Sequence, residues 1–274
     1  MKFGVSTFVT DEGIRPGALG AALEERGFES LFVAEHSHIP TGSTAPDGTE
    51  LARAYYRALD PLIALTAAAA ATTRLRLGTG VLLLVQRDVI QTAKEVASLD
   101  LLSGGRVILA VGAGWNRTEM RDHGTDPGVR GRLLDERLAA LKEIWTRDEA
   151  EFHGEYVRFG PMRMWPKPVQ RPHPPIYIGG HSPAALARVA AHGDGWFPIE
   201  VTPDDVRRVR GALAERGRTG VVITVPADPA GEGTLDAYAE AGADRATFHL
   251  ETMPEAATLR KLDELAALAA RYSG

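Results

Sequence analysis

Eight short apolar runs alternate along this chain with longer segments whose apolar residues recur at the period of a helix. Strands that alternate with helices give a parallel sheet, and eight such units fit a closed (β/α)8 barrel. We therefore expect an α/β fold, a TIM barrel, with residues 1–274 forming one domain. The strands are expected at residues 2–7, 30–34, 75–81, 106–111, 176–178, 195–198, 221–225 and 245–250.

Two connections are longer than one helix requires, so loop insertions are expected after the second and the fourth strand. The first is a polar, turn-rich segment at residues 37–53. The second holds a helix at residues 131–145, a small hairpin at 152–159, and a segment, 161–175, in which six prolines exclude regular structure. Further helices are expected at residues 16–26, 61–73, 89–102, 183–192, 204–216, 235–241 and 255–271.

The composition excludes several partners and chemistries. The net charge is −5 and no block of Lys and Arg stands out, so neither nucleic acid nor an anionic membrane is expected as a partner. The chain has no cysteine, which excludes disulfides, thiolate catalysis and Cys-ligated zinc. The amino terminus lacks the apolar core of a signal peptide, and the longest apolar stretch, 61–71, is too short to span a bilayer. We expect a cytoplasmic enzyme with a small-molecule substrate.

Glycines follow the expected fourth strand. Residues 106–111 lead into Gly112, Ala113 and Gly114, and the carboxyl ends of barrel strands form the active-site face. The missing side chains are expected to leave room for a flat ligand against the backbone, although glycines can also serve packing alone. The run resembles the start of a G-x-G-x-x-G dinucleotide fingerprint, but Arg117 stands where the third glycine would be, so we reject that fingerprint.

The expected fifth strand ends in a second glycine pair. Gly179 and Gly180 precede His181 and Ser182, and Ser182 suits the N-cap of the next helix, with Pro183 at its first position. Backbone N–H groups and the helix dipole then converge on one place. The pattern predicts an anion site for a phosphate-bearing cofactor, with a plain strand-to-helix turn as the alternative.

The sequence EHSH, which starts at Glu35, follows the second strand and also lies at the active-site face. One interpretation gives His36, with Glu35, acid/base or hydrogen-bonding work beside a cofactor, because histidine titrates near neutral pH. The other pairs His36 with His38 as metal ligands. That site needs further ligands, for which His249 and Glu251 at the eighth strand are the candidates.

Several sequence blocks, taken in order, resemble the bacterial luciferase-like oxidoreductase family, and more narrowly its subgroup that depends on coenzyme F420. The resemblance covers about residues 2–198 and is weaker from residue 201 onward. The blocks that carry it include DPLIALTAAAAATTRLRLGTGVLLL, QTAKEVASLDLLSGGRVILAVGAGW, ERLAALKEIW, PKPVQRPHPPIYIGGHSPAALARVA and GDGWFP.

This resemblance implies a luciferase-like barrel with a flavin or deazaflavin at its carboxyl-terminal mouth. It implies a non-prolyl cis peptide between Gly80 and Val81, and it places the family's acidic–His pair at Glu35 and His36, where relatives usually have Asp-His. Trp115 stands where a relative that acts on a sugar phosphate has a catalytic acid, which argues against that substrate. The residues implied to bind the cofactor are Gly80, Val81, Gly112, Gly114, Thr118, Gly179, Gly180, His181 and Ser182.

The function implied is hydride transfer between coenzyme F420 and an unidentified small organic substrate, with His36 and Glu35 as the catalytic residues. FMN is the alternative cofactor, and an FMN-dependent protein of this family would be a monooxygenase. A metal-dependent barrel hydrolase and a barrel that binds cofactor without catalysis are further alternatives. The resemblance also allows a homodimer, since members of the family often form one.

Overall fold

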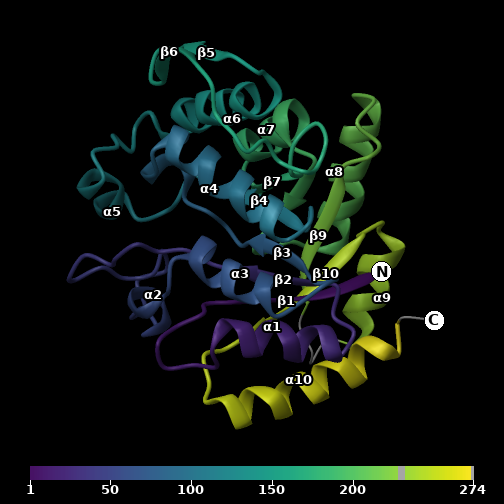
Figure 1. The fold of residues 1–274 in the computed structure, drawn as a ribbon. Coiled ribbons are helices and arrows are strands. Elements are labelled where there is room, and N and C mark those ends of the chain that lie inside the picture. Colours follow the sequence, from purple (N-terminus) through teal and green to yellow (C-terminus); the bar gives the residue numbers. More distant parts are fainter. Residues whose placement is uncertain (228–231, 273–274) are drawn as a thin grey trace.

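The computed structural model describes residues 1–227 and 232–272, and in it eight parallel strands close into a barrel (Figure 1). Their order around the barrel is β1-β10-β9-β8-β7-β4-β3-β2. The predicted fold and all eight predicted strands are confirmed, with ends that shift by a residue or two. The barrel strands are β1 (Lys2–Thr7), β2 (Ser30–Val33), β3 (Arg76–Thr79), β4 (Val107–Val111), β7 (Ile176–Gly179), β8 (Gly195–Phe197), β9 (Val222–Ala227) and β10 (Arg245–Leu250).

Helices form the outer layer, and their starts follow from local sequence. Proline stands at the first position of α1, α3, α7 and α8, where its missing N–H is not needed. No helix in the described part of the chain is long and apolar enough to cross a membrane. The helices are α1 (Pro16–Glu25), α2 (Ala54–Arg57), α3 (Pro61–Ala70), the 3-10 turn η1 (Leu84–Gln86), α4 (Val89–Leu102), α5 (Arg117–Asp122), α6 (Arg130–Thr146), α7 (Pro183–His192), α8 (Pro203–Glu215), α9 (Glu232–Glu240) and α10 (Glu255–Ala270).

The two predicted insertions are present. The connection after β2 contains α2, and the connection after β4 contains α5, α6 and a hairpin of β5 (Ala150–His153) with β6 (Arg158–Met162). The short helices α2 and α5 were not predicted. Residues 161–175 were predicted to lack regular structure, which is wrong for the first two, because β6 extends to Met162. Pro161 is tolerated there since the hairpin is a two-stranded sheet in which both strands are edges.

Side chains fill the barrel itself. Alternate residues of each strand point inward or out toward the helices. The inner cluster of Phe32, Ile108, Ala110, Tyr177 and Phe197 is buried, and the rest of the apolar core lies between the strands and the helices. Because the interior is packed, a ligand can enter only at an end of the barrel.

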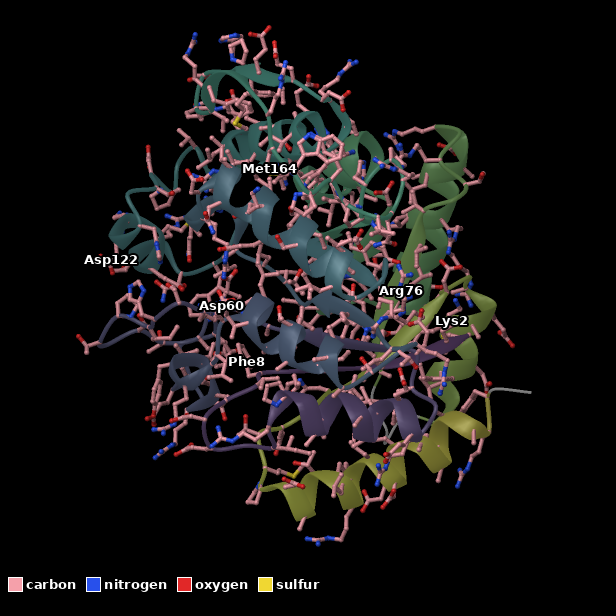
Figure 2. All side chains as sticks on the ribbon, in the orientation of Figure 1. Lys2, Phe8, Asp60, Arg76, Asp122 and Met164 are labelled. Atoms are coloured by element: carbon pink, nitrogen blue, oxygen red, sulfur yellow. The ribbon has the colours of Figure 1, made fainter. Side chains whose placement is uncertain are left out.

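The two ends of the barrel are far apart in Figure 2. Lys2 and Arg76, at the starts of β1 and β3, lie at one end, and Phe8, Asp60 and Asp122 lie at the other. The helices α2 and α5, which belong to the two insertions, are also at this second end (Figure 1). We call this end, where the strands finish, the barrel mouth.

A buried arginine completes the packing under α3. The Arg106 side chain donates five hydrogen bonds, to the carbonyls of Ser103, Leu75, Ala69 and Thr72 and to the Thr72 hydroxyl, at 2.7–3.0 Å. Ala69 and Thr72 belong to the end of α3 and its exit, where helix carbonyls lack partners within the helix. Arg106 therefore satisfies these groups and joins α3 to β4.

Candidate active site at the barrel mouth

Directly after β2, the adjacent side chains of Glu35 and His36 have different partners. Glu35 contacts Arg87 and the Leu83 N–H in the segment after β3, whereas His36 contacts Glu119 on α5. Both are buried, at 7 % and 8 % exposed. The acidic–His pair therefore divides into two side chains with different surroundings.

His36 is held by a carboxylate from a distant part of the sequence. Its Nδ1 lies 2.7 Å from Oε2 of Glu119, which is on α5 and completely buried. Burial alone would raise the pKa of Glu119, but hydrogen bonds from His36 and the Ser37 N–H lower it overall, so the carboxylate is the stable form. Because a carboxylate can only accept, His36 carries a hydrogen on Nδ1. Its Nε2 has no hydrogen-bond partner in the described part of the chain.

Three aromatic rings surround His36. The ring centroids of Phe8, Tyr55 and Trp115 lie 6.3, 5.4 and 5.5 Å from that of His36. They come from the end of β1, from α2 and from the segment after β4. Such rings exclude water, and they give a substrate that approaches His36 an apolar wall.

Glu35 binds an arginine on the outer side of the strand. Its Oε1 accepts a 2.6 Å hydrogen bond from Arg87 Nε, and its Oε2 accepts one from the Leu83 N–H. Burial raises the pKa of Glu35, and the Arg87 guanidinium, which also pairs with Asp60, opposes that shift. Glu35 thus fixes the loop after β3, and its catalytic role stays a prediction.

The peptide bond between Gly80 and Val81 is cis, as the family resemblance implied. The Val81 side chain then lies against two of the strand-end glycines. A Cβ on Gly112 would come within 2.7 Å of Val81 Cγ2, and one on Gly179 within 3.0 Å of Cγ1. The prediction that Gly112 leaves its space to a ligand is therefore wrong, because Val81 fills that space.

Gly114 is required by its backbone. Its φ of +72° is in the left-handed region, and a Cβ there would lie 3.0 Å from the Met120 side chain. Its space is thus also filled by protein atoms. Thr118 is exposed on α5, where its N–H donates to Asn116. Whether the backbone of these residues contacts a cofactor stays a prediction.

The loop from Gly179 to Ser182 has the predicted geometry. Ser182 is the N-cap of α7 and accepts a 3.2 Å hydrogen bond from the Ala185 N–H, and Gly180 has a φ of +90°. Within residues 1–227 and 232–272, the N–H groups of His181, Ser182 and Ala184 donate to no other group, and all three residues are exposed. Free N–H groups at a helix start suit an anion.

The four side chains considered as metal ligands do not gather. His36 binds Glu119, and His38 Nε2 lies 3.0 Å from Asp122 Oδ2. His249 and Glu251 are exposed at the end of β10. In the part of the chain that the structure describes, no three His, Cys, Asp or Glu side chains are placed to hold a metal ion.

Glu119 is the site residue that sequence reasoning missed. Its helix has only six residues, too few for a helical period to show. A signal was present, however: Asn116 with Glu119 three residues later is a helix-start pattern, and it follows the glycines of the fourth strand. The Asn116 side chain does cap α5, accepting from Thr118 and Glu119.

Comparisons with known proteins agree with the fold. The Mycobacterium tuberculosis protein Rv0953c, which has no assigned function, is 39 % identical over 284 aligned residues, 100 % of this chain and 98 % of the relative. An FMNH2-dependent dimethylsulfone monooxygenase from Pseudomonas putida is 37 % identical over 139 residues, 47 % of this chain and 38 % of the relative. A solved F420-dependent secondary alcohol dehydrogenase, in complex with an F420-acetone adduct, superposes with a TM-score of 0.76 at 18 % identity over 98 % of both chains.

The family model of luciferase-like monooxygenases matches residues 15–272. This match extends beyond residue 198, where the resemblance in the sequence became weak. Together with the full-length mycobacterial relative it confirms the predicted family. The chain belongs to the luciferase-like monooxygenase family.

Proposed function

We propose that the protein is an oxidoreductase that transfers a hydride between coenzyme F420 and a small organic substrate at the barrel mouth. The observation that carries this proposal is the 2.7 Å pair of His36 with the buried Glu119. Moving a hydride to or from a carbon that bears oxygen requires a matching proton at that oxygen. An imidazole whose Nδ1 donates to a carboxylate, and whose Nε2 has no partner in the described part of the chain, is suited to exchange that proton.

One feature at the mouth fits a cofactor that carries a phosphate. The exposed N–H groups at the start of α7 suit a phosphate. Both F420 and FMN carry a phosphate, so this feature supports a flavin or deazaflavin and does not choose between them.

The bound cofactor supplies the hydride chemistry. His36 Nε2 gives a proton to the substrate oxygen or takes one from it. Glu119 keeps Nδ1 protonated and stabilises the imidazolium that forms when Nε2 takes a proton. The three aromatic rings keep water from His36, and Glu35 positions the loop after β3 through Arg87 and Leu83.

A fluorescence titration of the protein with F420 and with FMN tests the proposal. We expect F420 to bind more tightly. Replacing Ala184 by Pro deletes one free N–H in the first turn of α7, where N–H groups have no partner within the helix, so affinity should fall about tenfold or more, the worth of one charged hydrogen bond. Ala256→Pro makes the same change at the start of α10 and should leave affinity unchanged.

The second candidate is a monooxygenase that uses reduced FMN, and the relative from Pseudomonas putida favours it. Tighter binding of FMN than of F420, with consumption of dioxygen on reduction, would establish this function instead. Binding of F420 without turnover of any alcohol, ketone or enone in a substrate screen would indicate a carrier.

A further inference from the structure

The Ser37 hydroxyl lies between the buried Glu119 and two histidine rings. Its Oγ is 2.6 Å from His123 Nε2, 2.9 Å from His38 Nδ1 and 3.3 Å from Glu119 Oε1. The Ser37 N–H donates to the same Oε1 at 3.0 Å. On the far side of the His38 ring, Nε2 is 3.0 Å from Asp122 Oδ2. A chain of contacts thus joins the surface to the carboxylate that holds His36.

Counting donors gives one arrangement of hydrogens that satisfies all the contacts of this cluster. The Ser37 hydroxyl has one hydrogen, and the carboxylates of Glu119 and Asp122 can only accept. All three contacts of Oγ are satisfied together when Ser37 donates to Glu119 and both rings donate to Oγ. His123 can do so as a neutral ring with its hydrogen on Nε2. His38 must then carry hydrogens on both nitrogens, which means that it is protonated.

Loss of one proton from His38 changes this arrangement. If the hydrogen on Nδ1 leaves, this nitrogen can only accept from Ser37 Oγ, while Nε2 keeps its bond to Asp122. Ser37 has a single hydrogen, so donating to His38 ends its donation to Glu119. The 3.3 Å separation from Glu119, longer than the two contacts with the rings, allows this exchange without moving the backbone.

We propose that Ser37 and His38 are positioning residues for His36: protonated His38 directs the Ser37 hydroxyl onto Glu119 and so weakens the hydrogen bond that this carboxylate accepts from His36 Nδ1. An added donor makes the carboxylate less basic, and an imidazolium at His36 then gives up its Nε2 proton more readily. This inference rests on the proposed function, which gives His36 its proton to exchange.

The cluster draws its charged groups from two segments. His36 and His38 belong to the segment after β2, and Glu119, Asp122 and His123 belong to α5 and its C-cap. Asp122 and His38 are half-exposed, whereas Glu119 and His36 are buried. A pH change in solution therefore reaches the buried pair through Ser37.

Nuclear magnetic resonance of the cofactor-free protein with labelled histidine tests the proposal. The hydrogen between His36 Nδ1 and Glu119 reports the basicity of the carboxylate through its chemical shift. In the wild-type protein we expect this resonance to move in step with the titration of the His38 ring. The Ser37→Ala protein should lose that movement, and Ser37→Thr, which keeps the hydroxyl, should retain it.

The variants separate the hydroxyl from the charge of His38. If the resonance still follows His38 in the Ser37→Ala protein, the charge acts through space and the proposal is wrong. No movement in the wild-type protein also overturns it. His38→Leu should abolish the movement, whereas His153→Leu, which removes an exposed histidine paired with Glu151 on the β5–β6 hairpin, should not.

The cofactor titration stays independent of these spectra. A protein that shows the expected coupling but binds neither F420 nor FMN would disprove the proposed function and leave the coupling in place. A protein that binds F420 but shows no coupling would disprove the inference alone. Thermal unfolding of each variant shows that a lost resonance does not result from a lost fold.

Discussion

His36 and Glu119 are 83 positions apart in the sequence, yet Nδ1 and Oε2 lie 2.7 Å apart at the barrel mouth. If His36 exchanges a proton in the reaction, His36→Ala should lower turnover about 10²–10⁴-fold, the usual worth of a general acid or base. Glu119→Gln should cause a smaller loss, because the amide keeps the shape of the carboxylate without its charge. The measurement is kcat for a substrate that the wild-type protein converts.

Cofactor affinity serves as the control for both substitutions, since neither side chain is placed to hold a cofactor phosphate. A loss of activity in His36→Ala that tracks a loss of cofactor binding would contradict the assigned role. Full activity of this variant would remove His36 from catalysis.

Because Val81 packs against Gly112, substitutions at these two positions should have coupled effects on stability. A Cβ at position 112 would lie 2.7 Å from Val81 Cγ2, so Gly112→Ala should destabilise the fold by about 1–3 kcal/mol through overpacking. Val81→Ala removes the clashing methyl groups, and the double variant should be more stable than the sum of the single changes predicts. Urea unfolding of the four proteins measures the coupling.

Gly211→Ala gives a matched control. Gly211 lies within α8, and a Cβ there would meet nothing within 4 Å. This change should stabilise the protein or leave it unchanged, because alanine has the higher helix propensity. Destabilisation of Gly211→Ala to the same extent as Gly112→Ala would show that packing against Val81 is not the cause.

The hydrogen bonds of the Glu24 carboxylate should make the stability of the fold fall in acid. Its carboxylate accepts hydrogen bonds from the N–H groups of Thr73, Arg74 and Leu75 at 2.6–3.0 Å. Burial alone would raise the pKa of Glu24, but these bonds lower it from 4.5 to about 2. The carboxylate therefore contributes its full stability above pH 4.5, and this contribution is lost as the pH falls toward 2.

Glu24→Gln should lower the free energy of unfolding at pH 7 by about 1 kcal/mol and flatten its dependence on pH below 4.5. Denaturant unfolding at several pH values measures both effects. Glu25→Gln, an exposed change on the same helix, is the control. Equal slopes for Glu24→Gln and the wild-type protein in acid would contradict the assignment.

Replacing the buried Arg106, which lies far from the mouth, should lower the stability of the fold strongly. Arg106→Met keeps much of the volume but leaves the carbonyls of Ala69, Thr72, Leu75 and Ser103 without these donors. Each unsatisfied buried acceptor costs about 1–3 kcal/mol before relaxation, so we expect a loss of about 3 kcal/mol or more. Calorimetry of this variant should show a lower Tm, while the exposed change Arg158→Met should leave the Tm unchanged.

The sequence predicts the barrel because strand and helix periods are local properties that repeat eight times. It also locates His36 and the 179–182 loop, since each follows directly from a strand end. Glu119 could not be predicted because the short helix α5 shows no helical period and because His36, the partner of Glu119, is remote in sequence. The prediction that Gly112 leaves room for a ligand is wrong for a related reason. The atoms that fill this space belong to Val81, and sequence spacing does not show packing between strands.

The loops after β2, β3 and β4 are tied to one another by Glu35 with Leu83 and Arg87, and by His36 with Glu119. The segment after β8, the end of β9 and the helix α9 instead line a groove of about 510 Å³, with Ile199, Pro226 and Tyr238 among its walls. The groove thus shares no residue with the contacts that hold Glu35 and His36. A substitution at Ile199 or Tyr238 should therefore leave the contact between His36 and Glu119 in place.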